Sequence, residues 1–153
     1  MTIPQDLHPF RVPTLIAVTD NVQAKLFLAN DREIDLVHTI STKLEPMEQE
    51  RVQIITGAGG ARSGEQHEQN QKFTREQLYA QLDADLVSRL RNGDFKALAV
   101  TVPQENINEL KESLHVDLLK VADAWVGKLL TNDDLVDIVQ HVQEEAGFDQ
   151  PVE

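Results

Sequence analysis

The sequence predicts one α/β domain in which a mixed β-sheet is flanked by helices. Three short apolar segments near the N-terminus are separated by turn residues, which is typical of an antiparallel meander. Further along, apolar runs alternate with helical repeats, which is typical of strands joined by helices. The length of 153 residues suits a single core, since domains usually hold about 100–200 residues. We expect one domain over 1–153, with its core at about 12–146 and a flexible tail at 147–153.

The first three strands are predicted from apolar runs that end at turn signals. Residues 15–20 form a short, nearly continuous apolar run, the pattern of a strand buried on both faces. Residues 24–30 follow the turn signal Asp20-Asn21, and residues 34–40 follow a second turn signal. These three segments are predicted to pair in sequence order.

Residues 41–72 are predicted to form a long glycine-rich loop. This stretch holds four of the seven glycines of the chain, at Gly57, Gly59, Gly60 and Gly64. Long connections without secondary structure are uncommon inside a compact domain, and they are usually either functional or disordered. We therefore expect the functional surface here.

A helix is predicted to follow this loop. Residues 74–77 fit a capping box, in which the Thr74 hydroxyl and the Gln77 side chain satisfy backbone amides that have no partner in the first turn. Leucines then recur every fourth residue from 78 to 90, which places them on one face of the helix. Gly93 is expected to end the helix in the left-handed conformation.

The last third of the chain is predicted to alternate between strands and helices. Residues 97–102 form a second buried strand, and Pro103 is expected to open a helix with an apolar stripe. Residues 121–126 are the next expected strand. The polar residues 131–134 are expected to cap a last helix that ends at Gly147.

The composition excludes several classes of protein. The absence of cysteine rules out a disulfide framework and a cysteine-based zinc site. No apolar run approaches the roughly 20 residues that span a bilayer, and the N-terminal stretch lacks the basic start of a secretion signal. We therefore expect a cytoplasmic protein with no membrane partner.

The charge is acidic and unevenly placed. The net charge of −12 opposes non-specific binding to nucleic acid or to an anionic membrane, so no DNA partner is expected. Residues 1–102 carry 11 basic and 14 acidic side chains, whereas 103–153 carry 3 lysines and 12 acidic side chains. An anion-binding surface is therefore expected in the first two-thirds, and the acidic last third is expected to be a solvated face.

The glycines invite a phosphate-binding interpretation that their spacing does not support. Glycines let backbone amides approach an anion closely. In residues 57–62, however, Arg62 stands where a dinucleotide fingerprint needs its third glycine, and no Gly-Lys-Ser/Thr ends the stretch. We therefore expect a surface loop and no cofactor.

Catalytic and metal motifs are also absent from the sequence. His67 lies between Glu65 and Glu68, but these spacings form no recognised metal-ligand set. Asp20 ends a buried strand, where it fits a turn residue better than a phosphoryl-transfer nucleophile. No serine lies in a Gly-x-Ser-x-Gly elbow. We therefore expect no catalytic residue and no metal site.

The order of these segments resembles a known family. The resemblance rests on the stretches 15–20, 24–27, 67–76 and 97–100 followed by Pro103. It covers most of residues 12–146 and is to the bacterial host attachment proteins, which are grouped with bacterial relatives of the archaeo-eukaryotic release factors. The resemblance implies a fold like the central domain of eukaryotic release factor one and of Pelota.

The resemblance implies no catalytic residue in this chain. In release factors the loop before the long helix carries Gly-Gly-Gln, which promotes hydrolysis of peptidyl-tRNA. The nearest match here is Gly59-Gly60-Ala61, and Gln66 follows Gly64 by two residues with no Gly-Gly before it. The release-factor motif is therefore missing, and we carry its role onto no residue.

Three functional hypotheses follow from the sequence. The first is a non-catalytic release-factor-like protein that binds ribosome or RNA through 57–72, with Arg62 pairing with a phosphate. Its expected binding residues are Gly57, Gly59, Gly60, Arg62, Gln66 and His67. The second is a hydrolase of an ester, nucleotide or peptidyl-tRNA, with the glycine amides as oxyanion donors and His67 as base. The third is an interaction protein that uses 103–153 to meet a basic partner or a second copy of itself.

Overall fold

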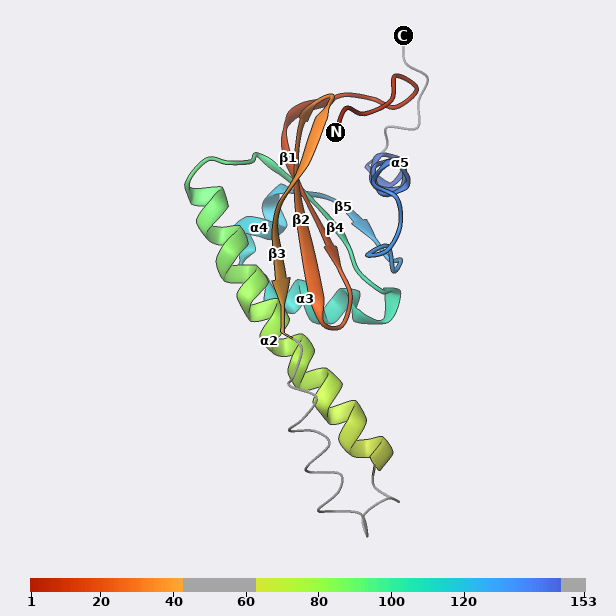
Figure 1. Cartoon of the computed structure of the whole chain (residues 1–153). Coiled ribbons are helices and arrows are strands. Elements are labelled where there is room, and N and C mark those ends of the chain that lie inside the picture. The colour runs from red at the N-terminus through yellow and green to blue at the C-terminus, as the bar shows by residue number, and fades with distance from the viewer. Residues whose placement is uncertain (43–62, 147–153) are drawn as a thin grey trace.

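The computed structural model describes residues 1–42 and 63–146. Within these residues the chain forms one five-stranded sheet and helices on both of its faces (Figure 1). In sequence order the elements are β1 (Phe10–Thr19), β2 (Gln23–Asp31), β3 (Glu33–Ser41), α2 (Ser63–Arg91), β4 (Ala97–Thr101), the 3-10 turn η2 (Gln104–Asn106), α3 (Ile107–Ser113), α4 (Val116–Val121), β5 (Ala122–Val126) and α5 (Leu135–Glu145).

The sheet is mixed, as the sequence predicts. Its strand order is β3-β2-β1-β4-β5. The first three strands pair antiparallel in sequence order, which confirms the predicted meander. β4 then lies parallel to β1, and β5 lies parallel to β4. The central strands β1 and β4 are the most apolar because both of their faces are covered.

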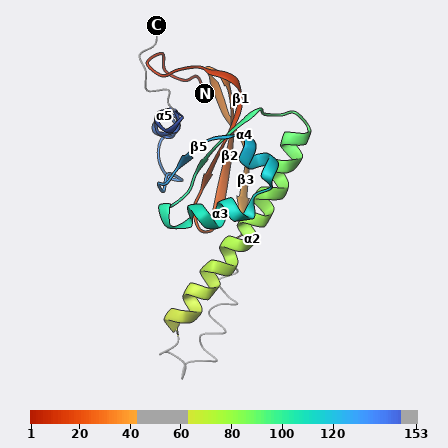
Figure 2. The same cartoon turned by 180° about the vertical axis from the view of Figure 1, so that it is seen from behind.

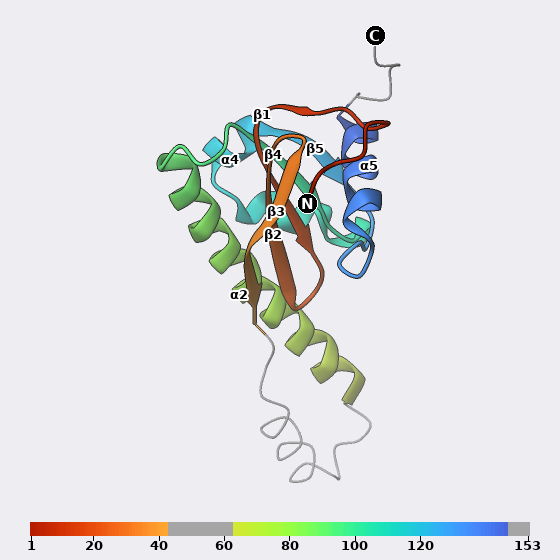
Figure 3. The same ribbon diagram turned by 45° about the horizontal axis from the view of Figure 1, so that its top comes forward.

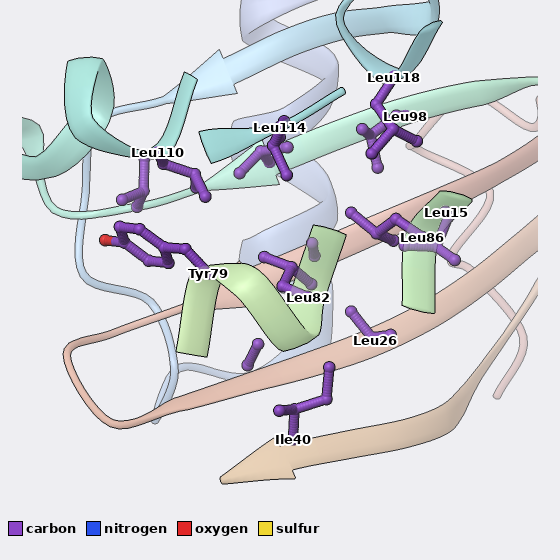
Figure 4. Close-up of a cluster of buried hydrophobic side chains, with 14 of the residues drawn as sticks. Leu15, Leu26, Ile40, Tyr79, Leu82, Leu86, Leu98, Leu110, Leu114 and Leu118 are labelled. Carbon is purple, nitrogen blue, oxygen red and sulfur yellow. The ribbon is translucent and has the colours of Figure 1, made fainter. Parts of the chain in front are cut away.

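One face of the sheet is covered by α2, α3 and α4, which lie together in Figure 2. The predicted leucine stripe of α2 forms the centre of this core, since Leu78, Leu82 and Leu86 are fully buried. Figure 4 shows Leu82 and Leu86 among the leucines of the sheet and of α3. The helical period of the sequence therefore identifies the correct packing face.

The opposite face of the sheet is covered by α5 and by residues near the N-terminus. Ile138, Val139 and Val142 of α5 are buried in the core on this face, while Ile3 and Phe10 close the same core from the other end. Figure 3 shows the N-terminal segment and α5 on this side. No helix within 1–42 and 63–146 has the length and apolar character needed to cross a bilayer.

The edge strand β3 has two irregular features. The first residues of the chain pair with its start, because the Ile34 amide donates to the Met1 carbonyl at 2.8 Å and Thr2 bridges to Glu33. Its pairing with β2 then shifts between Leu36 and His38, so that the strand has one extra residue, a β-bulge. Leu36, beside the bulge, is 53% exposed.

The structure corrects the predicted start of the long helix. α2 begins at Ser63, so residues 63–72 are helical and do not belong to a loop of 41–72. The stretch before Thr74 is rich in Glu and Gln, which favour helix, so the helix continues through the expected capping box. Thr74 is buried inside the helix, and its carbonyl accepts a hydrogen bond from Thr42 Oγ1 at 3.2 Å. The rest of the predicted loop, 43–62, and the predicted tail, 147–153, lie outside the described residues.

The sequence analysis does not predict the short helix α4. It has six residues, too few to show a helical period, and Val116 on it is 56% exposed. Its start is fixed by His115, whose Nδ1 accepts from the Asp117 amide at 3.0 Å, and the His115 amide donates to Asp83 Oδ1 at 2.7 Å. A local cap at His115 and a contact with α2 therefore place this short helix.

Gly93 ends α2 as predicted, and its replacement should destabilise the protein. Its φ is +80°, and the amide of the next residue, Asp94, donates to the Arg89 carbonyl at 3.0 Å. A Cβ at this position would meet no atom within 4 Å, so Gly93→Ala should cost only the strain of a left-handed alanine, about 1–2 kcal/mol of unfolding free energy. Gly93→Asn is the matched control and should lose less, because Asn tolerates this conformation. Equal losses in urea denaturation would contradict the explanation.

Candidate functional site

Four strands end at one edge of the sheet, which we call the carboxyl edge. β1, β4 and β5 are parallel, and β3 runs in the same direction because both β1 and β3 are antiparallel to β2. The N-terminal part of α2 extends past this edge in Figures 1, 2 and 3. Ligands of open α/β sheets bind outside the carboxyl ends of strands, so this edge is the expected location of a site.

The predicted binding residues are only partly described. Gly57, Gly59, Gly60 and Arg62 lie outside the described residues. The backbone at Gln66 and His67 is helical, in the first turns of α2, and not in the expected glycine-rich loop. These two residues therefore belong to the part of α2 that extends beyond the carboxyl edge.

Asp20 forms the tight turn between β1 and β2. Its Oδ1 accepts hydrogen bonds from the Val22 and Gln23 amides, both at 2.8 Å, and its Oδ2 accepts from Gln23 Nε2 at 3.3 Å. This is the geometry of an Asx turn. The prediction that Asp20 is a turn residue is confirmed. The neighbouring Asn21 Oδ1 accepts from Asn106 Nδ2 at 2.9 Å, which ties the turn to the segment after β4.

Contacts fix both the end of β3 and α2 at the carboxyl edge. The Thr42 amide donates to the Val22 carbonyl at 2.9 Å, so the end of β3 is bonded to the β1–β2 turn. Arg75 of α2 pairs with Glu109 of α3, with Nη2 and Nε at 3.1 and 3.2 Å from Oε2. Both side chains are mostly buried, so this pair fixes the two helices relative to each other.

Tyr79 lies beside this ion pair with an unusual environment. The residue is fully buried, and Figure 4 shows its hydroxyl pointing away from Leu82 and Leu86, with Leu110 beside the ring. Neither the hydroxyl nor Oε1 of Glu109 has a hydrogen-bond partner within 1–42 and 63–146. Burial, followed by the negative charge of Glu109, raises the pKa of Tyr79 to about 12. The phenol is therefore protonated at neutral pH.

Two exposed side chains mark the surface of α2 next to the carboxyl edge. Phe73 is 51% exposed, and the neighbouring Lys72 is also exposed. An exposed aromatic ring beside a cation is a common combination in surfaces that bind single-stranded nucleic acid, where bases stack and phosphates pair. Phe73 is not predictable as a surface residue from the sequence, because its position before the expected capping box suggests a buried contact.

A pocket of about 430 Å³ opens at the same edge. Its walls come from three segments that follow three parallel strands: residues 20–22 after β1, 103–105 after β4 and 127–132 after β5. The sequence identifies only the Asp20 turn among these. The other two segments carry helix-start signals but no ligand-binding motif, and only the topology brings them together.

The described histidines and carboxylates form no metal site. No group of three or more such side chains lies close enough to share an ion in the parts of the chain that the structure describes. His115 is 3.6 Å from Asp117, and His141 Nδ1 is 3.5 Å from Lys128 Nζ. These two histidines serve local surface contacts.

Comparisons with known proteins give one family and a distant structural likeness. A family model described as bacterial archaeo-eukaryotic release factor family 12 matches residues 13–142. No curated protein matches the chain. Among solved structures, the chain is similar to the crystal structure of the archaeal translation termination factor aRF1, at 15% identity and a TM-score of 0.48, over 86% of this chain. The match spans 37% of that factor, so this chain corresponds to little more than a third of it.

Proposed function

Since the chain belongs to bacterial archaeo-eukaryotic release factor family 12, we propose that it acts in translation by binding the ribosome through residues 57–72 and the adjoining surface of α2. The family match covers residues 13–142, which hold most of the sheet and its helices. This match supports the release-factor part of the resemblance. The observation that carries the choice of surface is the position of α2, whose N-terminal part extends past the carboxyl edge (Figure 1).

Residues that lie in sequence within or just before this extension suit contact with ribosomal RNA. The Phe73 ring can stack on an unpaired base, and Lys72 and Arg62 can pair with phosphates. The net charge of −12 disfavours non-specific binding to RNA at large. A specific site on the ribosome, where the chain can contact RNA through complementary surfaces, is therefore a better candidate for the ligand than free RNA.

Co-sedimentation with purified bacterial ribosomes tests the proposal. We expect the full chain to sediment with ribosomes at low salt and less at high salt, because phosphate contacts release counterions. Arg62→Ala should weaken binding about tenfold and reduce its salt dependence, since one charged contact is lost. The matched control is Arg11→Ala, which removes the same charge from an exposed side chain at the start of β1. Equal binding by both variants, at both salt concentrations, would contradict this surface.

The same samples separate binding from catalysis. Ribosomes that carry labelled peptidyl-tRNA should keep their peptide when the chain binds, if it acts by binding alone. Peptide release that His67→Ala abolishes would instead favour the hydrolase hypothesis. Ribosome binding that changes neither with salt concentration nor with Arg62→Ala would favour the hypothesis that 103–153 is the interaction surface. A role in host attachment remains an expectation of the resemblance.

A further inference from the structure

The pocket at the carboxyl edge lies at a switch point of the sheet. After β4 the chain turns into α3 and α4 on one face, whereas after β5 it turns into α5 on the other face. The loops that leave these neighbouring strands therefore diverge and leave a crevice between them, the standard location of a ligand in an open α/β sheet. Its volume of about 430 Å³ lies within the range of small-molecule sites.

The charges of the pocket disfavour an anionic ligand. Asp20 and Glu105 are the carboxylates of its lining, and Lys128 is the cation. Lys128 Nζ lies 3.5 Å from His141 Nδ1 of α5, so its charge is directed toward that helix. The nearby Lys25 Nζ donates to the Thr131 carbonyl at 2.9 Å. A phosphate or carboxylate in the pocket would therefore meet two carboxylates and one lysine, a lining whose net charge is negative.

The uncharged lining combines apolar walls with side-chain amides. Val22, Pro103 and Leu129 supply apolar surface, and Leu129 is 60% exposed. Amides come from Asn21, Gln104 and Asn132, which can both donate and accept hydrogen bonds. A ligand with a flat ring that carries both hydrogen-bond donors and acceptors on its edge is complementary to this lining.

Gly127 lets one of the lining amides lie close against the loop that follows β5. A Cβ at Gly127 would overlap the Gln104 amide oxygen and lie 3.0 Å from Ile107 Cδ1, so only glycine lets the Gln104 amide lie against this loop.

We propose that this pocket binds a free nucleoside, with the base between the apolar walls and read by the amides, and the ribose hydroxyls donating to Glu105 and to Asp20 Oδ2, the Asp20 oxygen that takes one hydrogen bond in the turn. Hydroxyl donors satisfy carboxylate acceptors without adding negative charge. This site uses other residues than the proposed ribosome-binding surface, and its existence does not depend on ribosome binding.

Direct titration of the full chain tests the proposal without ribosomes. Adenosine, guanosine, cytidine and uridine, and their 5′-monophosphates, are titrated separately by calorimetry. At least one nucleoside should bind, and its monophosphate should bind at least about tenfold more weakly, because the phosphate adds charge beside two carboxylates. Glu105→Ala should weaken the nucleoside about tenfold, since a hydrogen bond to a charged group is lost.

Two further variants decide the interpretation. Glu112→Ala removes an exposed carboxylate from α3 outside the pocket and should leave binding unchanged. Gly127→Ala should weaken the nucleoside by displacing the Gln104 amide, and its melting curve shows whether the fold is intact. The proposal is overturned if none of the four nucleosides binds, if the monophosphate binds as tightly, or if Glu105→Ala behaves like Glu112→Ala.

Discussion

Leu82→Ala is expected to lower the free energy of unfolding by about 3–5 kcal/mol, the largest effect that we predict for a single substitution. Leu82 is fully buried in the middle of α2, where the helix crosses the sheet (Figure 4). The truncation removes apolar contacts and leaves a cavity that the surrounding helices and strands cannot close, because they are packed against one another on all sides. Urea denaturation followed by the fluorescence of Trp125, the single tryptophan, measures the loss.

Leu129→Ala is the matched control for this change. It makes the same chemical truncation at a side chain that is 60% exposed, so the free energy of unfolding should change by less than about 0.5 kcal/mol. A loss at Leu82 no larger than that at Leu129 would mean that α2 does not cover the sheet as described.

The second large effect is an alkaline loss of stability that depends on Tyr79. Its pKa is about 12 in the folded protein against 10.0 for the free group, chiefly because the phenol is buried. Between these values the unfolded chain loses the tyrosine proton while the folded chain keeps it, so stability falls as pH rises. Each unit of pKa difference corresponds to about 1.4 kcal/mol, so we expect a loss of up to about 2 kcal/mol by pH 12.

Tyr79→Phe isolates this effect from the titration of lysines. The phenylalanine variant keeps the ring but has no ionisable group and no buried hydroxyl without a partner. At neutral pH its free energy of unfolding should therefore match that of the natural chain within about 1 kcal/mol. Above pH 10 the natural chain should lose stability faster than the variant. Parallel curves for the two proteins up to pH 12 would rule out a buried phenol at this position.

Much of the fold can be predicted from sequence because its elements have strong local patterns. The apolar run at 97–102 and the leucines of α2 carry clear periods, and the structure places them as a buried strand and a buried helix face. Gly93 ends α2 with the expected positive φ. The order of the first three strands follows from the short connections of the meander.

The predictions from sequence are wrong where tertiary contacts or competing local signals determine the secondary structure. Thr74 has the pattern of a helix start, yet the Glu- and Gln-rich stretch before it continues the helix to Ser63. α4 is too short for a period and depends on the contact between His115 and Asp83.

The site is harder to predict than the fold. The pocket joins three segments that are far apart in sequence, so no spacing reveals it. Tyr79 follows a stripe leucine and carries no motif, and only the packing of α2 against α3 makes its hydroxyl unusual. The glycines and Arg62 are predicted to bind through a loop whose residues 43–62 lie outside the described part of the chain, so their role stays a prediction.

The edge of β3 has a consequence for solubility at high concentration. An exposed, regular edge strand is a template on which other chains can add strands and start fibrils. Here the first residues of the chain occupy the start of that edge, and the extra residue after Leu36 disrupts the regular spacing of its middle. An incoming strand would find neither a free beginning nor a continuous row of donors and acceptors. The edge of β3 should therefore resist fibril growth even though apolar side chains are exposed at the bulge.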